Sequence, residues 1–248
     1  MARRRITIVL LLFKFLLGGS SLYGQESVSI RFRVFGAGLD HFKGLYYFDG
    51  KKHRPLSFNK SSRSKDTYLF HGTPELSIYA LNPAYQKNIG DIARFLPLAS
   101  CHLNRSLKEA LLVLVAHPKN QKARLERRQY KLFLIDDSHA AFPRDSIQLI
   151  NATEVNIFGN VAASRIDLRS DFSQGVDYSA YTENDKAVPI SLAIKSENRP
   201  RLTMSNDLPL PRGRRVVLIL MNPRREGSIR IVLRSLIETV PSQKVRVD

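Results

Sequence analysis

Two apolar runs, each ended by a proline, constrain the fold of this chain most strongly. Residues 111–116 read Leu-Leu-Val-Leu-Val-Ala before His117-Pro118, and residues 216–221 read Val-Val-Leu-Ile-Leu-Met before Asn222-Pro223. Runs of six residues are too short for a membrane-spanning helix or an ordinary buried helix. A proline cannot donate to a strand ladder, so it ends each run. We therefore predict two strands that are buried on both faces.

Each buried run is followed by a basic connection and then by a second apolar segment, at residues 130–135 and 229–233. This order predicts one hairpin in each half of the chain. An alternating strand also opens each half, at residues 28–35 and 147–150. The recurrence predicts a tandem duplication of one β-module. The alternative is that any two buried hairpins of an all-β protein share this pattern.

Other short β-rich segments are separated by Gly, Pro, Asn and Ser, at residues 45–48, 55–58, 67–70 and 75–81. We predict an all-β protein with two tandem immunoglobulin-like or sandwich-type modules and very little helix. One helical turn is expected at residues 106–110. The expected boundaries are a first module at 27–137, a second at 142–238 and a flexible tail at 239–248.

The N-terminus has the order of a signal peptide. Arg3-Arg4-Arg5 precede an apolar run from Ile6 to Leu17, and Gly18-Gly19-Ser20-Ser21 follow. We predict a signal peptide at residues 1–24 and an exported protein that is periplasmic, on the cell surface or secreted. A retained membrane anchor is the alternative, although Lys14 interrupts the apolar run.

The chain is strongly basic, with a formal net charge of +17. Removal of the four basic residues in the leader lowers this to +13 and leaves a surplus that attracts polyanions. If the two hairpins are equivalent, their connections form one basic end that contacts an anionic envelope polymer or lipid head groups. The residues of this predicted site are Lys119, Lys122, Arg124, Arg127, Arg128, Arg224 and Arg225. The alternative is that they are ordinary solvated loop charges. No nucleic-acid recognition signature is present.

Catalytic and metal-binding signatures are absent from the sequence. There is no Gly-x-Ser-x-Gly and no His-Glu-x-x-His, and Cys101 is the only cysteine. No intramolecular disulfide can form, and we expect Cys101 to be a small buried apolar residue. No two of the six histidines are two or four residues apart, so we expect surface or turn positions. We predict no catalytic residues, no cofactor and no metal.

Aromatic side chains leave one alternative open. Tyr46, Tyr47, Tyr178 and Tyr181 could stack on a sugar ring, but aromatic residues at alternating strand positions are usually core residues or cross-strand pairs. A pair of catalytic carboxylates needs no sequence signature, so an exported glycosidase-like hydrolase stays an alternative.

Residues 142–153 and 214–220, together with the proline-ended hairpin, carry a resemblance to known sequences. They resemble a group of uncharacterised secreted β-sandwich proteins of Verrucomicrobia-type bacteria. The resemblance implies export and a sandwich fold, and it brings no catalytic residues. From these observations together we predict a non-enzymatic binding or structural component of the bacterial cell envelope, with a basic polyanion-binding module as a further alternative.

Overall fold

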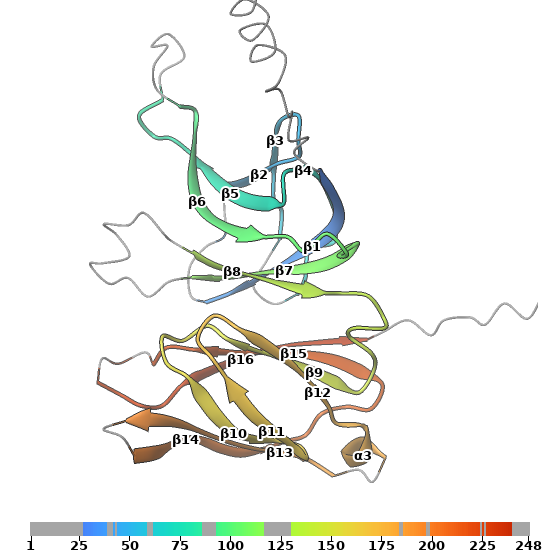
Figure 1. Ribbon diagram of the computed structural model, residues 1–248, viewed down its shortest axis with the longest axis vertical. Coiled ribbons are helices and arrows are strands. Elements are labelled where there is room, and N and C mark those ends of the chain that lie inside the picture. Colours follow the sequence, from blue (N-terminus) through green and yellow to red (C-terminus); the bar gives the residue numbers. More distant parts are fainter. Residues whose placement is uncertain are drawn as a thin grey trace, which may run out of the picture.

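The computed structural model describes residues 27–38, 42, 44–58, 62–85, 93–116, 130–183, 186–196, 199–223, 225 and 227–239. Within these ranges the chain forms strands β1 to β16 and one short helix, α3 (Ser179–Thr182) (Figure 1). The predicted all-β class with two sandwich modules is confirmed.

Module 1, which we define as residues 28–136, consists of two four-stranded sheets. The inner sheet has the order β4-β1-β7-β8, and the outer sheet has the order β3-β2-β5-β6. The strands are β1 (Val28–Ala37), β2 (Leu45–Phe48), β3 (His53–Pro55), β4 (Tyr68–Gly72), β5 (Glu75–Leu81), β6 (Phe95–His102), β7 (Glu109–Ala116) and β8 (Tyr130–Asp136).

Module 2, defined as residues 146–239, has an inner sheet of order β12-β9-β15-β16 and an outer sheet of order β11-β10-β13-β14. The two modules have the same strand order, because adding eight to each strand number of module 1 gives the strand at the equivalent place in module 2. The opening strand also pairs in parallel with the long apolar strand in both modules. The strands are β9 (Ser146–Asn151), β10 (Ile157–Val161), β11 (Ser164–Leu168), β12 (Ser173–Asp177), β13 (Val188–Ser196), β14 (Arg199–Leu208), β15 (Arg214–Met221) and β16 (Val232–Thr239).

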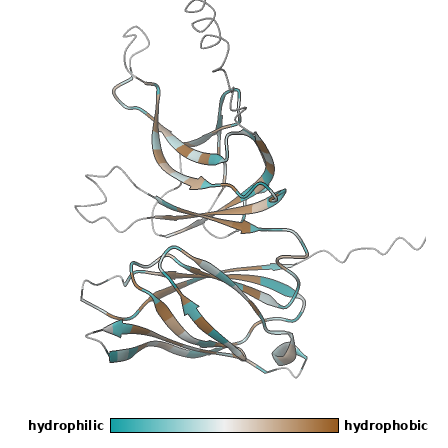
Figure 2. Cartoon of the chain, viewed as in Figure 1, coloured by the Kyte–Doolittle hydropathy of each residue, from teal (hydrophilic) through white to brown (hydrophobic). Residues whose placement is uncertain are grey.

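The four sheets stack as layers, with the two inner sheets facing each other in the middle (Figure 1). Each module has its own core between its two sheets. A third apolar cluster joins the inner sheets, and it contains Leu111 and Val113 of β7 with Val217 and Ile219 of β15. These two strands are therefore apolar on both faces because one face meets the module core and the other meets the partner module, and Figure 2 shows hydrophobic residues along the middle layers.

Ion pairs at the edge of this contact also link the modules. Arg63 of module 1 pairs with Asp137 of the connection at 2.6 Å and with Glu238 of β16. Arg215 of β15 binds the same Asp137 carboxylate at 3.0 Å, and its guanidinium lies over the Phe142 ring at 4.8 Å. Apolar packing and charge together hold the inner sheets against each other, so the outer sheets lie at opposite ends of the block.

Two strand predictions are wrong in their bounds. A strand was predicted at 55–58, but β3 ends at Pro55, which has no backbone N–H to donate to the neighbouring strand. Leu56, the next residue, is buried in the core of module 1. The segment predicted at 229–233 is irregular until β16 begins at Val232. The Thr203 hydroxyl accepts a hydrogen bond from the Ile231 N–H at 3.1 Å and donates one to the Ile229 carbonyl. These two backbone groups are therefore bonded to a side chain and not to a neighbouring strand.

The helical turn predicted at 106–110 is also wrong. Asn104 accepts a hydrogen bond from the Ser106 N–H at 3.1 Å, and this local turn leads directly into β7 at Glu109. The described helix, α3, lies elsewhere and has four residues. Among the described residues no helix is long and apolar enough to cross a membrane.

Candidate binding faces on the outer sheets

Each outer sheet turns one face toward its own core and the other face outward. In β2, Leu45 and Tyr47 point into the core of module 1, so Tyr46 and Phe48 point outward. In β10, Ile157 and Val161 are buried, so Phe158 and Asn160 point outward. Because the inner sheets cover each other, these two outward faces are the broad sheet faces that remain available to a ligand.

A β-bulge makes the two outward faces comparable residue by residue. The register between β5 and β6 shifts between Ile78 and Tyr79, and the register between β13 and β14 shifts between Leu192 and Ala193. Aligning the bulges makes Tyr79 equivalent to Ala193. The hydrogen-bonded registers of the two sheets then give six further equivalent positions. In the order module 1 and module 2, they are Tyr46 and Phe158, Phe48 and Asn160, His53 and Arg165, Pro55 and Asp167, Leu81 and Lys195, and Phe95 and Pro200.

Aromatic side chains close the outward face of module 1. The His53 ring lies parallel to the Phe95 ring with a centroid distance of 3.9 Å, and Tyr79 meets His53 edge-on at 4.7 Å. Tyr46 meets Phe95 edge-on at 5.1 Å, and Phe48 lies 5.2 Å from His53. His53 and Phe95 come from opposite edge strands, so the outer sheet curls until its edges approach. We call these five residues the ring cluster.

The ring cluster holds its histidine in the neutral form. Partial burial among the rings lowers the pKa of His53, and the nearby positive charge of Arg94 lowers it further. Nε2 of His53 is buried and has no hydrogen-bond partner within the described ranges. A protonated imidazole would bring an unpaired charge to this position, which is why the neutral form is favoured.

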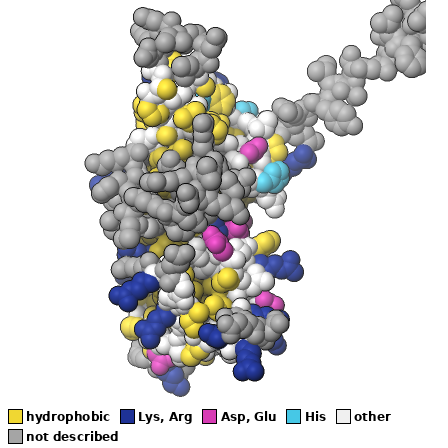
Figure 3. Space-filling model, turned by 90° about the vertical axis from the view of Figure 1, so that its left-hand side faces the viewer, with side chains coloured by type: hydrophobic (Ala, Val, Ile, Leu, Met, Phe, Trp, Pro, Cys, Tyr) yellow, Lys and Arg dark blue, Asp and Glu magenta, His cyan; other side chains and the backbone are white. Residues whose placement is uncertain are grey.

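Exposed apolar and basic groups surround the ring cluster. Phe48 is 38% exposed and Leu81 is 45% exposed, whereas most large apolar side chains of this module are buried. The Arg94 guanidinium lies 5.4 Å from the centre of the Phe95 ring, and the exposed pair Lys51-Lys52 forms the β2–β3 turn. Figure 3 shows hydrophobic side chains grouped over the upper part of the molecule, and Lys and Arg side chains scattered among hydrophobic and other groups over the lower part. This face of module 1 is therefore apolar at its centre and basic at its rim.

The equivalent face of module 2 is open. Ala193 stands where module 1 has Tyr79, and Pro200 stands where it has Phe95, so neither position supplies an aromatic ring. A shallow depression of about 310 Å³ lies here, over the β10–β11 hairpin. Its lining residues are Phe158, Gly159, Asn160, Arg165, Ile166 and Asp167.

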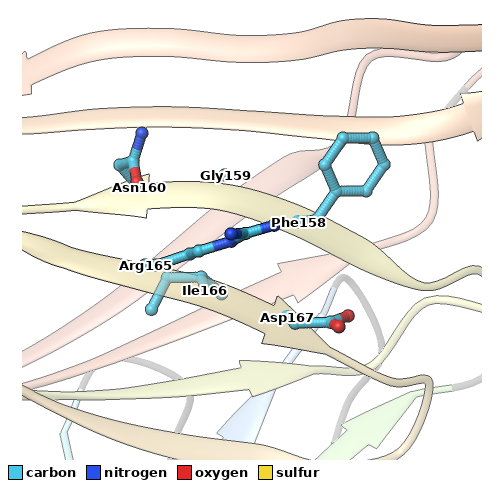
Figure 4. A pocket seen from close by; sticks show the side chains of 6 residues that line it. All are labelled: Phe158, Gly159, Asn160, Arg165, Ile166 and Asp167. Atoms are coloured by element: carbon cyan, nitrogen blue, oxygen red, sulfur yellow. The ribbon is translucent and has the colours of Figure 1, made fainter.

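The side chains of this depression come from two paired strands (Figure 4). Phe158 and Asn160 stand on either side of Gly159 on β10, while Arg165 extends from β11 toward Phe158 and Asp167 points from the same strand. The lining thus combines one aromatic ring, one cation, one carboxylate and one amide. Hydrogen-bond donors and acceptors are both available at this surface.

Gly159 brings the strands under the depression close together. Its φ of +145° lies in a region that side chains disfavour, and a Cβ at this position would lie 2.0 Å from the Ser191 carbonyl oxygen. The equivalent residue in module 1 is Tyr47, whose side chain fills the core. The same backbone position is therefore occupied by a ring in one module and by no side chain in the other.

The predicted basic site falls almost wholly outside the described residues. The structure places only Arg225 of the seven, in an exposed position in the β15–β16 connection. Lys119, Lys122, Arg124, Arg127, Arg128 and Arg224 lie outside those ranges, so the predicted basic end stays a prediction.

Three other sets of predicted residues are placed by the structure. Tyr47 and Tyr178 are buried in the two module cores, Tyr181 packs partly against the core of module 2, and Tyr46 forms a cross-strand pair with Tyr79. Among the described residues, no three His, Cys, Asp or Glu side chains come close enough to hold a metal ion. His41 and His117 lie outside those residues.

Cys101 is half-buried rather than fully buried, and it packs against the core of module 1. Burial raises the pKa of its thiol to about 12, with a smaller contribution from Glu75. The thiol is therefore protonated near neutral pH and is a poor nucleophile.

The residues of the depression were missed by the sequence analysis. The alternation of Ser164-Arg165-Ile166-Asp167-Leu168 indicates a half-buried strand with Arg165 and Asp167 on one face. That signal would have identified β11. It would not have located the depression, because half of the lining comes from β10, which pairs with β11 and was not predicted.

Comparisons with known proteins add little to this description. No family model matches the chain, and no curated protein matches it. Among solved structures, the chain is similar to a product complex of a multi-modular glycogen-degrading pneumococcal virulence factor, SpuA, with 10% identity over 71% of this chain and a TM-score of 0.19. The chain spans 26% of that protein.

Proposed function

We propose that this chain is an exported, non-enzymatic binding component of the bacterial cell envelope, and that it contacts an anionic lipid surface through the outward face of module 1. The observation that carries the proposal is the exposed, apolar and aromatic centre of this face with cations at its rim. Phe48 and Leu81 are exposed whereas the rings of His53, Tyr79 and Phe95 beside them are half-buried, and Arg94 and Lys51-Lys52 flank this face.

The chemistry of this face suits the boundary between water and lipid. Apolar and aromatic side chains enter the region below the head groups, and Lys and Arg side chains reach the phosphates. Amphipathic aromatic residues such as Tyr46 and Tyr79 are favoured at the same depth. A purely anionic soluble polymer would use the cations but would gain nothing from Phe48 and Leu81.

The N-terminal end of module 1 lies near the face that we propose to contact lipid. Val28, the first residue of β1, pairs with Gly72 at the end of β4, and Ser29 pairs with His71. Gly50 in the β2–β3 turn lies so close to His71 that a Cβ on it would lie 2.0 Å from the His71 carbonyl oxygen. The chain that follows the expected export leader therefore enters module 1 beside the ring cluster, so the leader would lie near this face until it is removed.

Vesicle sedimentation tests the proposal. The purified exported chain is mixed with vesicles of phosphatidylglycerol and phosphatidylcholine in equal amounts, and with phosphatidylcholine alone, at rising salt. We expect binding to the anionic vesicles, and we expect Phe48→Ser with Leu81→Ser to weaken it about tenfold, because two apolar side chains no longer enter the lipid.

The matched control changes the equivalent positions of module 2, Asn160→Ser with Lys195→Ser, and should leave vesicle binding within about twofold. Equal vesicle binding by the Phe48 and Leu81 variant and the unchanged chain would overturn the proposal. If heparin then retained both proteins equally as well, the polyanion-binding alternative would stand in its place.

A further inference from the structure

The depression on module 2 has a property that the lipid contact does not use. Its equivalent in module 1 is filled by rings of this chain, which shows that the curled outer sheet accommodates planar, ring-sized groups at this place. In module 2, Ala193 and Pro200 take the positions of Tyr79 and Phe95 and bring no aromatic ring toward the depression, which is lined by residues of β10 and β11. A ring-shaped ligand can therefore occupy it.

We propose that this depression binds one sugar ring of a neutral envelope polysaccharide. The inference is independent of the lipid contact, since it concerns the opposite end of the four-layer block. Three features of the depression point to a glycan as the ligand, and they are the aromatic wall, the mixed polarity of the lining and the open shape.

The aromatic wall is Phe158, which takes the position of Tyr46 in module 1. A pyranose presents an apolar face of C–H groups, and such a face packs on an aromatic ring as other apolar surfaces do. Ile166 beneath the hairpin is buried, so the floor of the depression offers no competing polar side chain.

The polar lining discriminates between ligand classes. The Arg165 guanidinium only donates hydrogen bonds, a carboxylate such as that of Asp167 accepts them, and the Asn160 amide does both. A sugar hydroxyl also donates and accepts, so it can pair with all three side chains. A phosphate or carboxylate would gain from Arg165 but would be repelled by Asp167, which is on the same face of the same strand.

The shape favours one unit of a chain over a small enclosed molecule. The depression is shallow and open to solvent, and its side chains are held by the strands of a hairpin rather than by a loop. A site on a sheet face lets the rest of a polymer continue past it on both sides. Placement on strands also keeps Phe158 and Arg165 in position before binding, which lowers the ordering cost.

The test is an amide-detected NMR titration of the exported chain with chitotetraose and with cellotetraose, each up to about 10 mM, a concentration that detects a Kd near 1 mM. We expect shift changes at residues 158–167 and at Ala193 for at least one of the two. Ala193→Tyr, which restores the residue of module 1, should abolish these changes, and Asp167→Asn should weaken binding at least fivefold. Asp207→Asn changes a carboxylate on β14 outside the depression and should leave binding unchanged.

A second titration separates a sugar site from an anion site. Inorganic phosphate at the same concentration should neither shift the amides at 158–167 nor compete with the oligosaccharide. Failure of both oligosaccharides to shift these amides, or shifts that persist unchanged in Ala193→Tyr, would overturn the proposal, as would competition by phosphate. None of these results depends on vesicle binding.

Discussion

The outward faces of the two outer sheets share a backbone plan and differ in almost every side chain. Both have the same strand order and a bulge at the same place, and both hairpins contribute the same positions. In module 1 these positions hold the five side chains of the ring cluster, and in module 2 they hold one aromatic ring, an amide, a guanidinium, an alanine and a proline. The backbone decides where side chains stand on the face, and the side chains decide whether the face is closed or open.

The difference also changes what each outer sheet contributes to stability. Aromatic pairs add about 0.5–1.5 kcal/mol beyond the area that they bury, and module 1 has four such pairs that involve His53 or Phe95. The outward face of module 2 has no equivalent set among the described residues. A protein that retains such an open face has a less stabilised outer sheet there, and a ligand can supply the missing contacts.

The largest effect on stability is expected at the core-facing position that holds Tyr47 in module 1 and Gly159 in module 2. Tyr47 is 4% exposed, and its ring meets Phe32 at 5.2 Å and Tyr68 at 5.6 Å. Tyr47→Ala removes this packing and should lower the free energy of unfolding by about 3–5 kcal/mol, measured by urea denaturation.

Gly159→Ala adds a side chain instead of removing one, yet it should also destabilise. Strain at its positive φ costs about 1–3 kcal/mol, and the overlap with the Ser191 carbonyl adds to this. Gly213→Ala is the control, because Gly213 has a φ of +73° and no atom within 4 Å of the added Cβ. A Gly159→Ala protein as stable as Gly213→Ala would mean that the strands under the depression are not closely apposed.

The sequence predicted the inner sheets better than the outer ones. The runs that became β7 and β15 are recognisable because both faces of an inner strand are buried, which leaves an unbroken apolar signal. The strands of the outer sheet of module 2 are half-buried and were not predicted, and Gly159 in β10 and the bulge at Leu192 in β13 interrupt the alternation of two of them. The open face could not be predicted, because it depends on the ladder registers that bring Ala193 beside Phe158.

An intermediate effect is expected for the rings themselves. Phe95→Ala removes the partner of both His53 and Tyr46, and it should lower the free energy of unfolding by about 1–3 kcal/mol, because Phe95 is only half-buried. Pro200→Ala, at the equivalent exposed position, should change it by less than about 0.5 kcal/mol. Similar losses for the two variants, measured by urea denaturation, would show that the ring cluster does not stabilise module 1.

The smallest effect is the pH dependence that His53 gives to the stability of the protein, with Arg165 at the equivalent position of module 2 as the control. Burial among the rings and the charge of Arg94 place the pKa of folded His53 below the value of about 6.5 that an unfolded chain has. Between the pKa of His53 in the folded chain and that in the unfolded chain, the unfolded chain binds more protons. The stability that comes from the neutral His53 is therefore complete above about pH 6.5 and is lost as the pH falls. His53→Phe keeps the stacking and removes the titration, so its stability should fall less than that of the unchanged chain between pH 7.5 and pH 5.

Every other ionisable group is the same in the two proteins, so the difference between them reports on His53. Arg165→Gln, the matched change in module 2, should leave the pH dependence over this interval as it is, because it changes nothing in the ring cluster around His53. An NMR titration of the His53 ring gives the direct measurement. A His53 pKa above 6.5 would show that the imidazole reaches water or an anion, and that the ring cluster is open in solution in the way that the face of module 2 is.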